Sequence, residues 1–347
     1  MSEVRSMSSK MLVKAAQDLG LTVKVVAGSK NFIEVSSDTQ SMYIQATAFS
    51  VNNQVATRIA NNKYLTKKVL RQHGVPTLRS WLITKKSEAK KIIAKHQPFP
   101  FVLKPAQGAH GNDVYVNIES EEEAFPLLDK IFKGKTDEGY LLEQYFVGHD
   151  LRVFVVGKEG VAVLERIPAN VTGDGQHTVR QLVQKFNQHP LVGEGYEKPM
   201  CKIRLNGEAK RTLEKQGFTL KSIPEKDQQV FVRQNANIST GGIGRDATDS
   251  IPEKVKQLAV DACQAIGLEI AGVDILFNDQ SGEAVILEIN DCPGIDVHHF
   301  PVIGKPRNVA KSIMSYLFQE SLAGSVATTH DHHFSWREHF PFLPLLS

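Results

Sequence analysis

Apolar residues recur at helical spacing in several stretches of the chain, and each stretch predicts a helix. The first covers residues 8–20, with Met11, Leu12, Ala15 and Leu19 on one face and Gly20 as its end. Residues 50–76 predict one or two helices closed by a glycine and a proline. Ser120, with Glu123 as capping-box partner, and Thr178 are expected helix N-caps. The remaining segments are 120–132, 178–188, 253–268 and 307–320.

Runs of Val, Ile, Leu and Phe between these segments predict strands. Two longer runs, 151–169 and 270–290, predict hairpins, and single strands are expected at 22–27, 32–37, 42–48, 100–105, 113–118 and 140–146. The mixture predicts an α+β fold. Its expected units are an N-terminal α/β unit with linker helices (1–95), a small lobe (96–148), a large lobe (149–320) and a flexible tail (321–347).

Composition narrows the class of protein. With 347 residues the chain suits two or three packed units, and 41% hydrophobic and 23% charged residues are typical of a globular protein. The net charge of +3 is small, and the lysines are dispersed, so nothing favours a nucleic-acid surface. The three cysteines are far apart, which favours a reducing compartment. We expect a cytoplasmic protein with neither nucleic-acid nor membrane partners.

The second hairpin carries the most informative polar residues. Asp274 lies within GVDILF, and Glu288 and Asn290 lie two residues apart in LEIN, on one face of the paired strand. Three oxygen ligands in apolar sequence are costly unless a cation neutralises them, and oxygen ligands suit Mg²⁺. The alternative is that the acids are exposed or pair with lysine, but an Asp among Val, Ile and Leu favours the metal.

Two other segments have weaker signals. FVLKPAQGAHGNDV, residues 101–114, places Lys104 at a strand end before a loop with two glycines, which suits either an anion-binding loop or a plain hairpin turn. Glu143 ends an apolar strand and Asp150 follows a turn. These acids suit an exocyclic amine and ribose hydroxyls, or are solvated at a hinge.

At roughly residues 48–318 the chain resembles the ATP-grasp carboxylate–amine ligases, and most of all the ATP-grasp domains of cyanophycin synthetases and of bifunctional bacterial glutathione synthetases. The resemblance is carried by NKYLTKKVLRQHGVP, ERIPANVTGDGQHTVRQLV, NANISTGG, AGVDI, LEIN and GKPRNVA. It implies an ATP-grasp fold, in which two α+β lobes hold ATP.

The resemblance also implies a role for each matching residue. Lys63 and Lys104 would contact ATP phosphates, and the loop from Gln107 to Asn112, with Gly108, His110 and Gly111, would close over them. Glu143 would accept the adenine amine beside the backbone of Gln144, Tyr145 and Phe146, and Asp150 would bind the ribose. Asp274, Glu288 and Asn290 would hold two Mg²⁺ ions, or Mn²⁺ in their place.

The reacting groups are implied in the same way. Arg152 and Arg166 would face an acyl phosphate, against the alternative of ordinary surface ion pairs, and Asn237 and Ser239 would line the acceptor side. The resemblance implies a ligase that joins a small-molecule carboxylate, an amino acid or peptide, to an amine, with release of ADP and phosphate. The alternatives are a small-molecule kinase and a nucleotide-binding module without catalysis. Because little sequence flanks the match, we expect a stand-alone enzyme; a homodimer is left open.

Other polar residues have weaker claims to a role. We expect Cys292 to be a small buried thiol, and we weigh contact of His298 and His299 with substrate against a structural role. The tail histidines His330, His332 and His333 resemble a metal tract, but a solvated tail is favoured. Lys305 and Arg307 suit either a substrate carboxylate or solvation at a helix start.

Overall fold

The structure, a computed structural model, describes residues 4–26, 28–97, 99–107, 114–133, 139–194, 198 and 200–323. The predicted helices are confirmed, with residues 50–76 forming two helices and 307–320 falling in a further two. Their bounds are α1 (Met7–Asp18), α2 (Gln54–Ala60), α3 (Lys63–Gln72), α5 (Glu121–Ile131), α6 (Val179–Asn187), α8 (Glu253–Ile266), α10 (Val309–Leu317) and α11 (Gln319–Ala323).

Side chains cap these helices largely as predicted. Thr178 forms a full capping box with Gln181 at the start of α6. Ser120 accepts a hydrogen bond from the Glu123 backbone N–H at the start of α5, but the Glu123 carboxylate accepts from Glu119, so the predicted capping box is only half formed.

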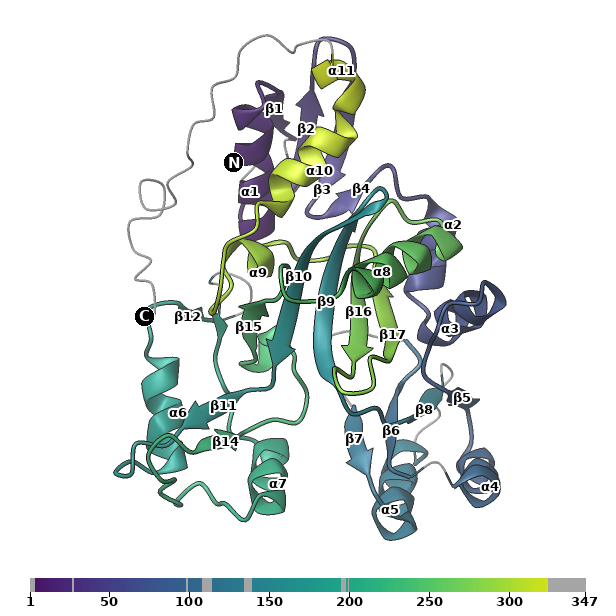
Figure 1. Ribbon diagram of the computed structural model, residues 1–347, viewed down its shortest axis with the longest axis vertical. Helices are drawn as coiled ribbons and strands as arrows, with labels where there is room; N and C mark the ends of the chain where they lie inside the picture. Colours follow the sequence, from purple (N-terminus) through teal and green to yellow (C-terminus); the bar gives the residue numbers. More distant parts are fainter. Residues whose placement is uncertain are drawn as a thin grey trace.

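A five-stranded antiparallel sheet, in the order β15-β10-β9-β16-β17, forms the centre of the molecule (Figure 1). Its strands are β9 (His149–Val156), β10 (Glu159–Ile167), β15 (Ile243–Asp246), β16 (Ile270–Phe277) and β17 (Ala284–Asn290). Val153 and Val155 on β9 pack in the core that contains α8, while Phe154 and Val156 pack in the core that contains α1 and α10. Because both faces are covered, the strands read as continuous apolar runs.

The N-terminal strands form a separate antiparallel sheet, β1-β2-β3-β4, which shares a core with α1 and α10 (Figure 1). They are β1 (Thr22–Val25), β2 (Phe32–Ser36), β3 (Ser41–Gln45) and β4 (Ala48–Phe49). The last helices therefore return to the first, and Ser8 at the start of α1 reaches Asp296, which follows the central sheet in the chain.

A third sheet, β5-β8-β6-β7, packs against α4 and α5. Its strands are β5 (Ser80–Ile83), β6 (Phe101–Pro105), β7 (Tyr115–Ile118) and β8 (Tyr140–Gln144), and α4 is Lys86–His96. The division into domains stays a prediction, but β5 pairs with β8, so this sheet takes a strand from before residue 96.

Residues between β10 and β15 form a small unit with its own core of Ala169, Val179, Leu213 and Val230. Most of its elements were not predicted, because they are short or largely polar. The elements of this region that the sequence missed are β11 (Asn170–Thr172), β12 (Val192–Gly193), β13 (Met200–Cys201), α7 (Gly207–Lys215), β14 (Gln229–Phe231) and the 3₁₀ helix η1 (Ile238–Thr240).

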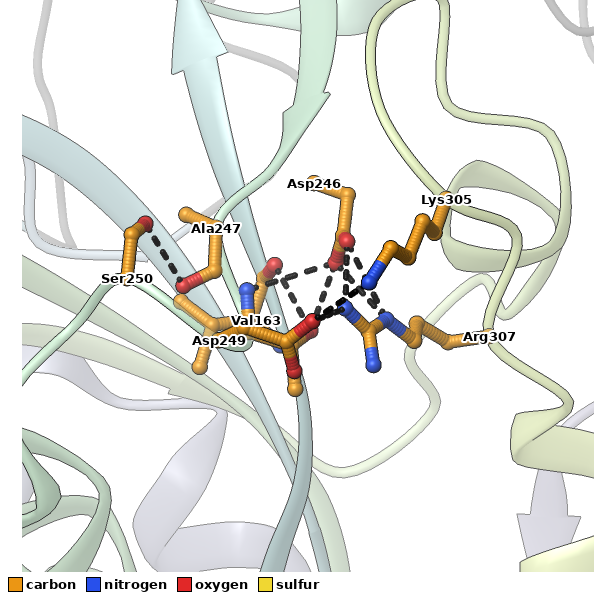
Figure 2. A network of polar contacts seen from close by, with 8 residues as sticks. Val163, Asp246, Ala247, Asp249, Ser250, Lys305 and Arg307 are labelled. Carbon is orange, nitrogen blue, oxygen red and sulfur yellow. Dashed lines mark hydrogen bonds and ion pairs between the residues drawn. The ribbon is translucent and has the colours of Figure 1, made fainter.

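An ion-pair network fixes the chain between β17 and α10. Figure 2 shows Arg307 directed at Asp246, which ends β15, and at Asp249 beyond it, with Lys305 also on Asp249. The Nη2 of Arg307 lies 2.7 Å from Asp246 and 2.8 Å from Asp249. These two basic residues, candidates for a substrate carboxylate, therefore have protein partners.

No helix in the part of the chain that the structure describes is long and apolar enough to span a bilayer.

Candidate active site

Two cavities adjoin one another between the central sheet and its neighbouring units. The first has a volume of about 790 Å³ and the second about 700 Å³. They share lining residues from α3, from the segment after β6, from the start of η1 and from the central sheet: Lys63, Gln107, Asn237, Arg166 and Glu288.

The first cavity has apolar walls and a polar end. Val102, Leu276 and Leu287, from β6, β16 and β17, supply apolar wall surface, as a flat aromatic ligand would require. It gathers most of the residues for which an ATP contact was predicted. These are Lys63, Lys104, Gln107, Glu143, Gln144, Tyr145, Phe146 and Asp150. Gly108, His110 and Gly111 lie outside the described residues.

Glu143 is buried between two lysines. Its carboxylate lies 2.7 Å from the ammonium group of Lys104 and 3.2 Å from the ammonium group of Lys67, a buried residue of α3. Lys67 also donates to the carbonyl of Leu287 at 3.1 Å, so it joins α3, β8 and β17. Burial would raise the pKa of Glu143, but the charges of Lys104 and Lys67 lower it, so the carboxylate is ionised.

Lys67 was not among the site residues predicted from the sequence. Lys63 and Lys67 are one helical turn apart, so both must face the same side of α3, and that spacing was the available signal. The predicted contacts of Glu143 with adenine and of Lys104 with phosphate stay predictions.

Lys67 gives a testable dependence of stability on pH. Burial lowers its pKa from 10.5 to about 8, against the opposing charge of Glu143. Between these values the unfolded chain holds a proton that native Lys67 has released, so this residue makes the free energy of unfolding rise from about pH 8 to 10.5. Urea denaturation across this range should show a rise in wild type that exceeds that of Lys67→Met by about 3 kcal/mol. Equal rises would contradict the assignment.

Cross-strand register assembles a second charged cluster on the central sheet. Asp150 is opposite Arg166, and Asp274 is opposite both Arg152 and Glu288. Arg166 donates to Asp150 at 2.6 Å and lies 3.0 Å from Asp274, and Arg152 donates two hydrogen bonds to Asp274. The ion pairs of both arginines are therefore buried or partly buried, unlike the ordinary surface ion pairs that were the alternative.

The electrostatics of this cluster follow from its burial. Burial alone would raise the pKa of Asp274, but Arg152 and Arg166 hold it at about 2. Burial raises the pKa of Asp150 above its usual range, although Arg166 opposes this.

The predicted metal ligands are adjacent but differ in access. Glu288 and Asn290 line the second cavity, whereas Asp274 is wholly buried beneath the two arginines and lines neither cavity. Carboxylate and amide oxygens on neighbouring strands fit Mg²⁺, with phosphate oxygens completing its shell. The described residues hold no group of three acidic, His or Cys side chains that would bind a metal without such help.

The second cavity is lined by the residues predicted for the acceptor side and by others that were not predicted from the sequence. Arg152, Asn237 and Ser239 line it, with Asn237 and Ser239 at η1. Ser6, Ser8 and Thr47 line it from the N-terminal unit, and residues 290–294, 296 and 297, from the end of β17 onward, also line it. The N-terminal contribution depends on long-range packing of α1, which no local motif reveals.

Three other expectations are settled by burial. Cys292 is exposed and lines the second cavity, so the expectation of a buried thiol was wrong. His298 and His299, in α9 (Asp296–His299), are each 1% exposed, line neither cavity, and have pKa values that burial lowers to about 3 and about 4. Contact with substrate was therefore the wrong alternative for both. The tail histidines lie outside the described residues.

Comparison with known proteins accounts for this geometry. Residues 60–178 and 228–317 match the family profile described as the RimK-like ATP-grasp domain. A cyanophycin synthetase of Nostoc sp. is 35% identical over 324 residues, covering 92% of this chain and 36% of the relative. The bifunctional glutathione biosynthesis protein GshAB of Desulfotalea psychrophila is 32% identical over 317 residues, covering 90% of this chain and 41% of that protein.

A solved structure gives the same relationship. The crystal structure of a bifunctional glutathione synthetase from Pasteurella multocida is 32% identical, with a TM-score of 0.68, and the match covers 91% of this chain and 43% of that one. The chain thus spans roughly two-fifths of the length of these relatives. The segment 179–227, between the two matched parts, contains α6, α7 and most of the small unit.

Proposed function

The chain belongs to the RimK-like ATP-grasp family, and on that basis we propose that it is an ATP-dependent ligase that joins a carboxylate to an amine. The observation that carries the proposal is the junction of the two cavities at Lys63, Arg166 and Glu288. A nucleotide in the first cavity would place its terminal phosphate where a carboxylate in the second cavity can reach it.

The first chemical step transfers a phosphoryl group. A carboxylate oxygen of the acid attacks the γ-phosphorus of ATP, the bond to the β–γ bridging oxygen breaks, and ADP leaves. Such a transfer needs positioning and charge neutralisation. Lys63 lies at the cavity junction, and Arg152 and Arg166 lie on the strands beside it. A guanidinium can bind two oxygens of a phosphate or carboxylate at once.

The second step forms the C–N bond. The amine nitrogen attacks the carbonyl carbon of the acyl phosphate, phosphate leaves with its oxygen, and the amine gives up a proton. Arg152, Asn237 and Ser239 line the cavity in which this occurs and are proposed to orient the acyl phosphate and the amine.

Glu288, Asn290 and Asp274 would hold the divalent metal. The metal, as two Mg²⁺ ions or Mn²⁺ in their place, would neutralise phosphate charge. For Asp274 to take part, the carboxylate must be shared with or released by Arg152 and Arg166, which now occupy both of its oxygens. The three residues lie on strands that are already paired in this register. Metal binding would therefore need a change of side-chain position but none of the backbone.

Trapping with hydroxylamine tests the reaction class without knowledge of the natural amine. With ATP, Mg²⁺ and a carboxylic acid that the enzyme accepts, hydroxylamine should attack the acyl phosphate and yield a hydroxamate together with ADP. The twenty protein amino acids and a set of dipeptides provide the acids to screen. Glu288→Gln is the inactive control.

Two results would contradict the ligase. A kinase acting on a hydroxyl would release ADP and form a stable phosphoester without hydroxamate. A module that only binds the nucleotide would release no ADP above background with any acid, while its ATP affinity remained measurable by calorimetry.

A further inference from the structure

Acidic and basic side chains both line the second cavity. Lys63, Arg166 and Glu288 lie where it meets the first cavity. The residues with charged side chains that line the second cavity only are Arg152, Lys198, Asp291 and Asp296. A ligand in this cavity would therefore meet carboxylates as well as cations.

Asp296 is a buried carboxylate without a cation. Its side chain is 6% exposed, and Oδ1 accepts a hydrogen bond of 2.8 Å from the hydroxyl of Ser8, at the start of α1. Among the described residues it forms no ion pair. Burial raises its pKa, and the hydrogen bond from Ser8 opposes this.

The cations that line the same cavity are occupied by other groups. The Lys63 ammonium lies 3.7 Å from Glu288, and Lys198 donates to the carbonyl of Pro190 at 2.7 Å. Arg152 and Arg166 bind Asp274 and Asp150. A buried carboxylate without a cation lowers the stability of the fold. Such groups occur at binding sites, where a ligand supplies the positive charge.

Asp291 adds a second acid on the same wall. Its Oδ1 accepts from the side-chain amide of Asn61 at 3.4 Å, and the described residues offer it no cation either. The cavity lining thus presents two carboxylates that form no ion pair among the described residues and can accept further hydrogen bonds. An ammonium group, with three N–H donors, suits such a wall.

We propose that Asp296 binds a primary ammonium group of a substrate in the second cavity, so that the enzyme selects a molecule carrying an amino group, an amino acid or a peptide N-terminus. The proposal rests on the proposed ligase reaction and adds the group that is recognised. That group belongs either to the acid that is activated or to the amine that attacks, and the experiment separates these two sources.

The test is Asp296→Asn, which keeps the size of the side chain and an acceptor for Ser8 but removes the charge. In the hydroxamate assay, with amino acids as acids, a 10- to 100-fold rise in the KM of the acid would place its ammonium at Asp296. If hydroxamate kinetics are unchanged but the KM rises by this factor for an accepted amine that carries a second, non-attacking amino group, the ammonium belongs to the acceptor. The KM for ATP should not change in either case.

Glu283→Gln is the matched control, because it also neutralises one acid, but at an exposed residue that lines neither cavity. It should change neither KM. If neither KM responds to Asp296→Asn, the ammonium site is wrong and Asp296 serves only to hold α1.

Wild-type protein provides a second measurement that needs neither variant nor turnover. Calorimetry should show the amino acids that bind losing at least tenfold in affinity when replaced by their des-amino forms, such as propionate for alanine or glutarate for glutamate. Equal affinities would overturn the ammonium site. Absence of any hydroxamate from wild type would instead count against the ligase, so the two failures are distinguishable.

Discussion

Glu288→Gln is expected to reduce ATP turnover by at least 10²- to 10³-fold while leaving the fold intact. Glu288 lines both cavities and faces Asp274 across β16 and β17, where the γ-phosphate and its metal are proposed to lie. The amide keeps the volume of the side chain but removes one of the two negative charges available to Mg²⁺. ADP release with a saturating acid and amine, over a range of Mg²⁺ concentrations, measures the effect.

The fold should survive because the ion pair that the described residues give this carboxylate is loose. The Lys63 ammonium is 3.7 Å away and both side chains are partly exposed, so the pair is worth no more than about 1 kcal/mol. Glu283→Gln, an exposed acid just before the same strand, is the control and should retain wild-type activity. Wild-type ADP release by Glu288→Gln at saturating Mg²⁺ would overturn the metal assignment.

Residues with strong local signals were predictable from sequence. The helix α8 has apolar positions at helical spacing and ends at Gly267, whose φ of +83° favours glycine. The hairpin of β16 and β17 showed Asp274, Glu288 and Asn290 as polar residues in apolar strands, and its register places them together. Here the prediction and the structure agree, because the pairing of two strands that are adjacent in sequence is determined locally.

What escaped prediction depends on contacts distant in sequence. The helix α7 buries only Ala209, Thr212 and Leu213 of its nine residues, so its periodicity is weak. His298 was a candidate for contact with substrate because it follows β17, the strand of Glu288 and Asn290. In the structure, Phe154 of β9 packs against its ring. The link between Ser8 and Asp296 spans 288 positions along the chain, and no motif announces it.

The lysine pair around Glu143 gives the largest expected effect on stability. Glu143 is 0% exposed, and the side chains of Lys67 and Lys104 are 1% and 7% exposed. In wild type one carboxylate offsets two ammonium groups. Glu143→Gln removes that charge, leaves two buried amines with an amide between them and lowers the pKa of Lys67 further. Removal of one partner from a buried ion pair typically costs about 3–5 kcal/mol.

We therefore expect Glu143→Gln, without nucleotide, to lose about 3 kcal/mol or more in the free energy of unfolding at pH 7, measured by urea denaturation. The loss should be smaller at pH 9, because Lys67, with a pKa of about 8 even beside Glu143, is then neutral in both proteins. Lys67→Met in the Glu143→Gln background should recover part of the loss, since it removes a buried amine that has lost its carboxylate partner. If the single variant is within 1 kcal/mol of wild type at pH 7, or if the added Lys67→Met lowers stability further, the cluster is not held by charge. Glu143 would then be free to serve the nucleotide alone.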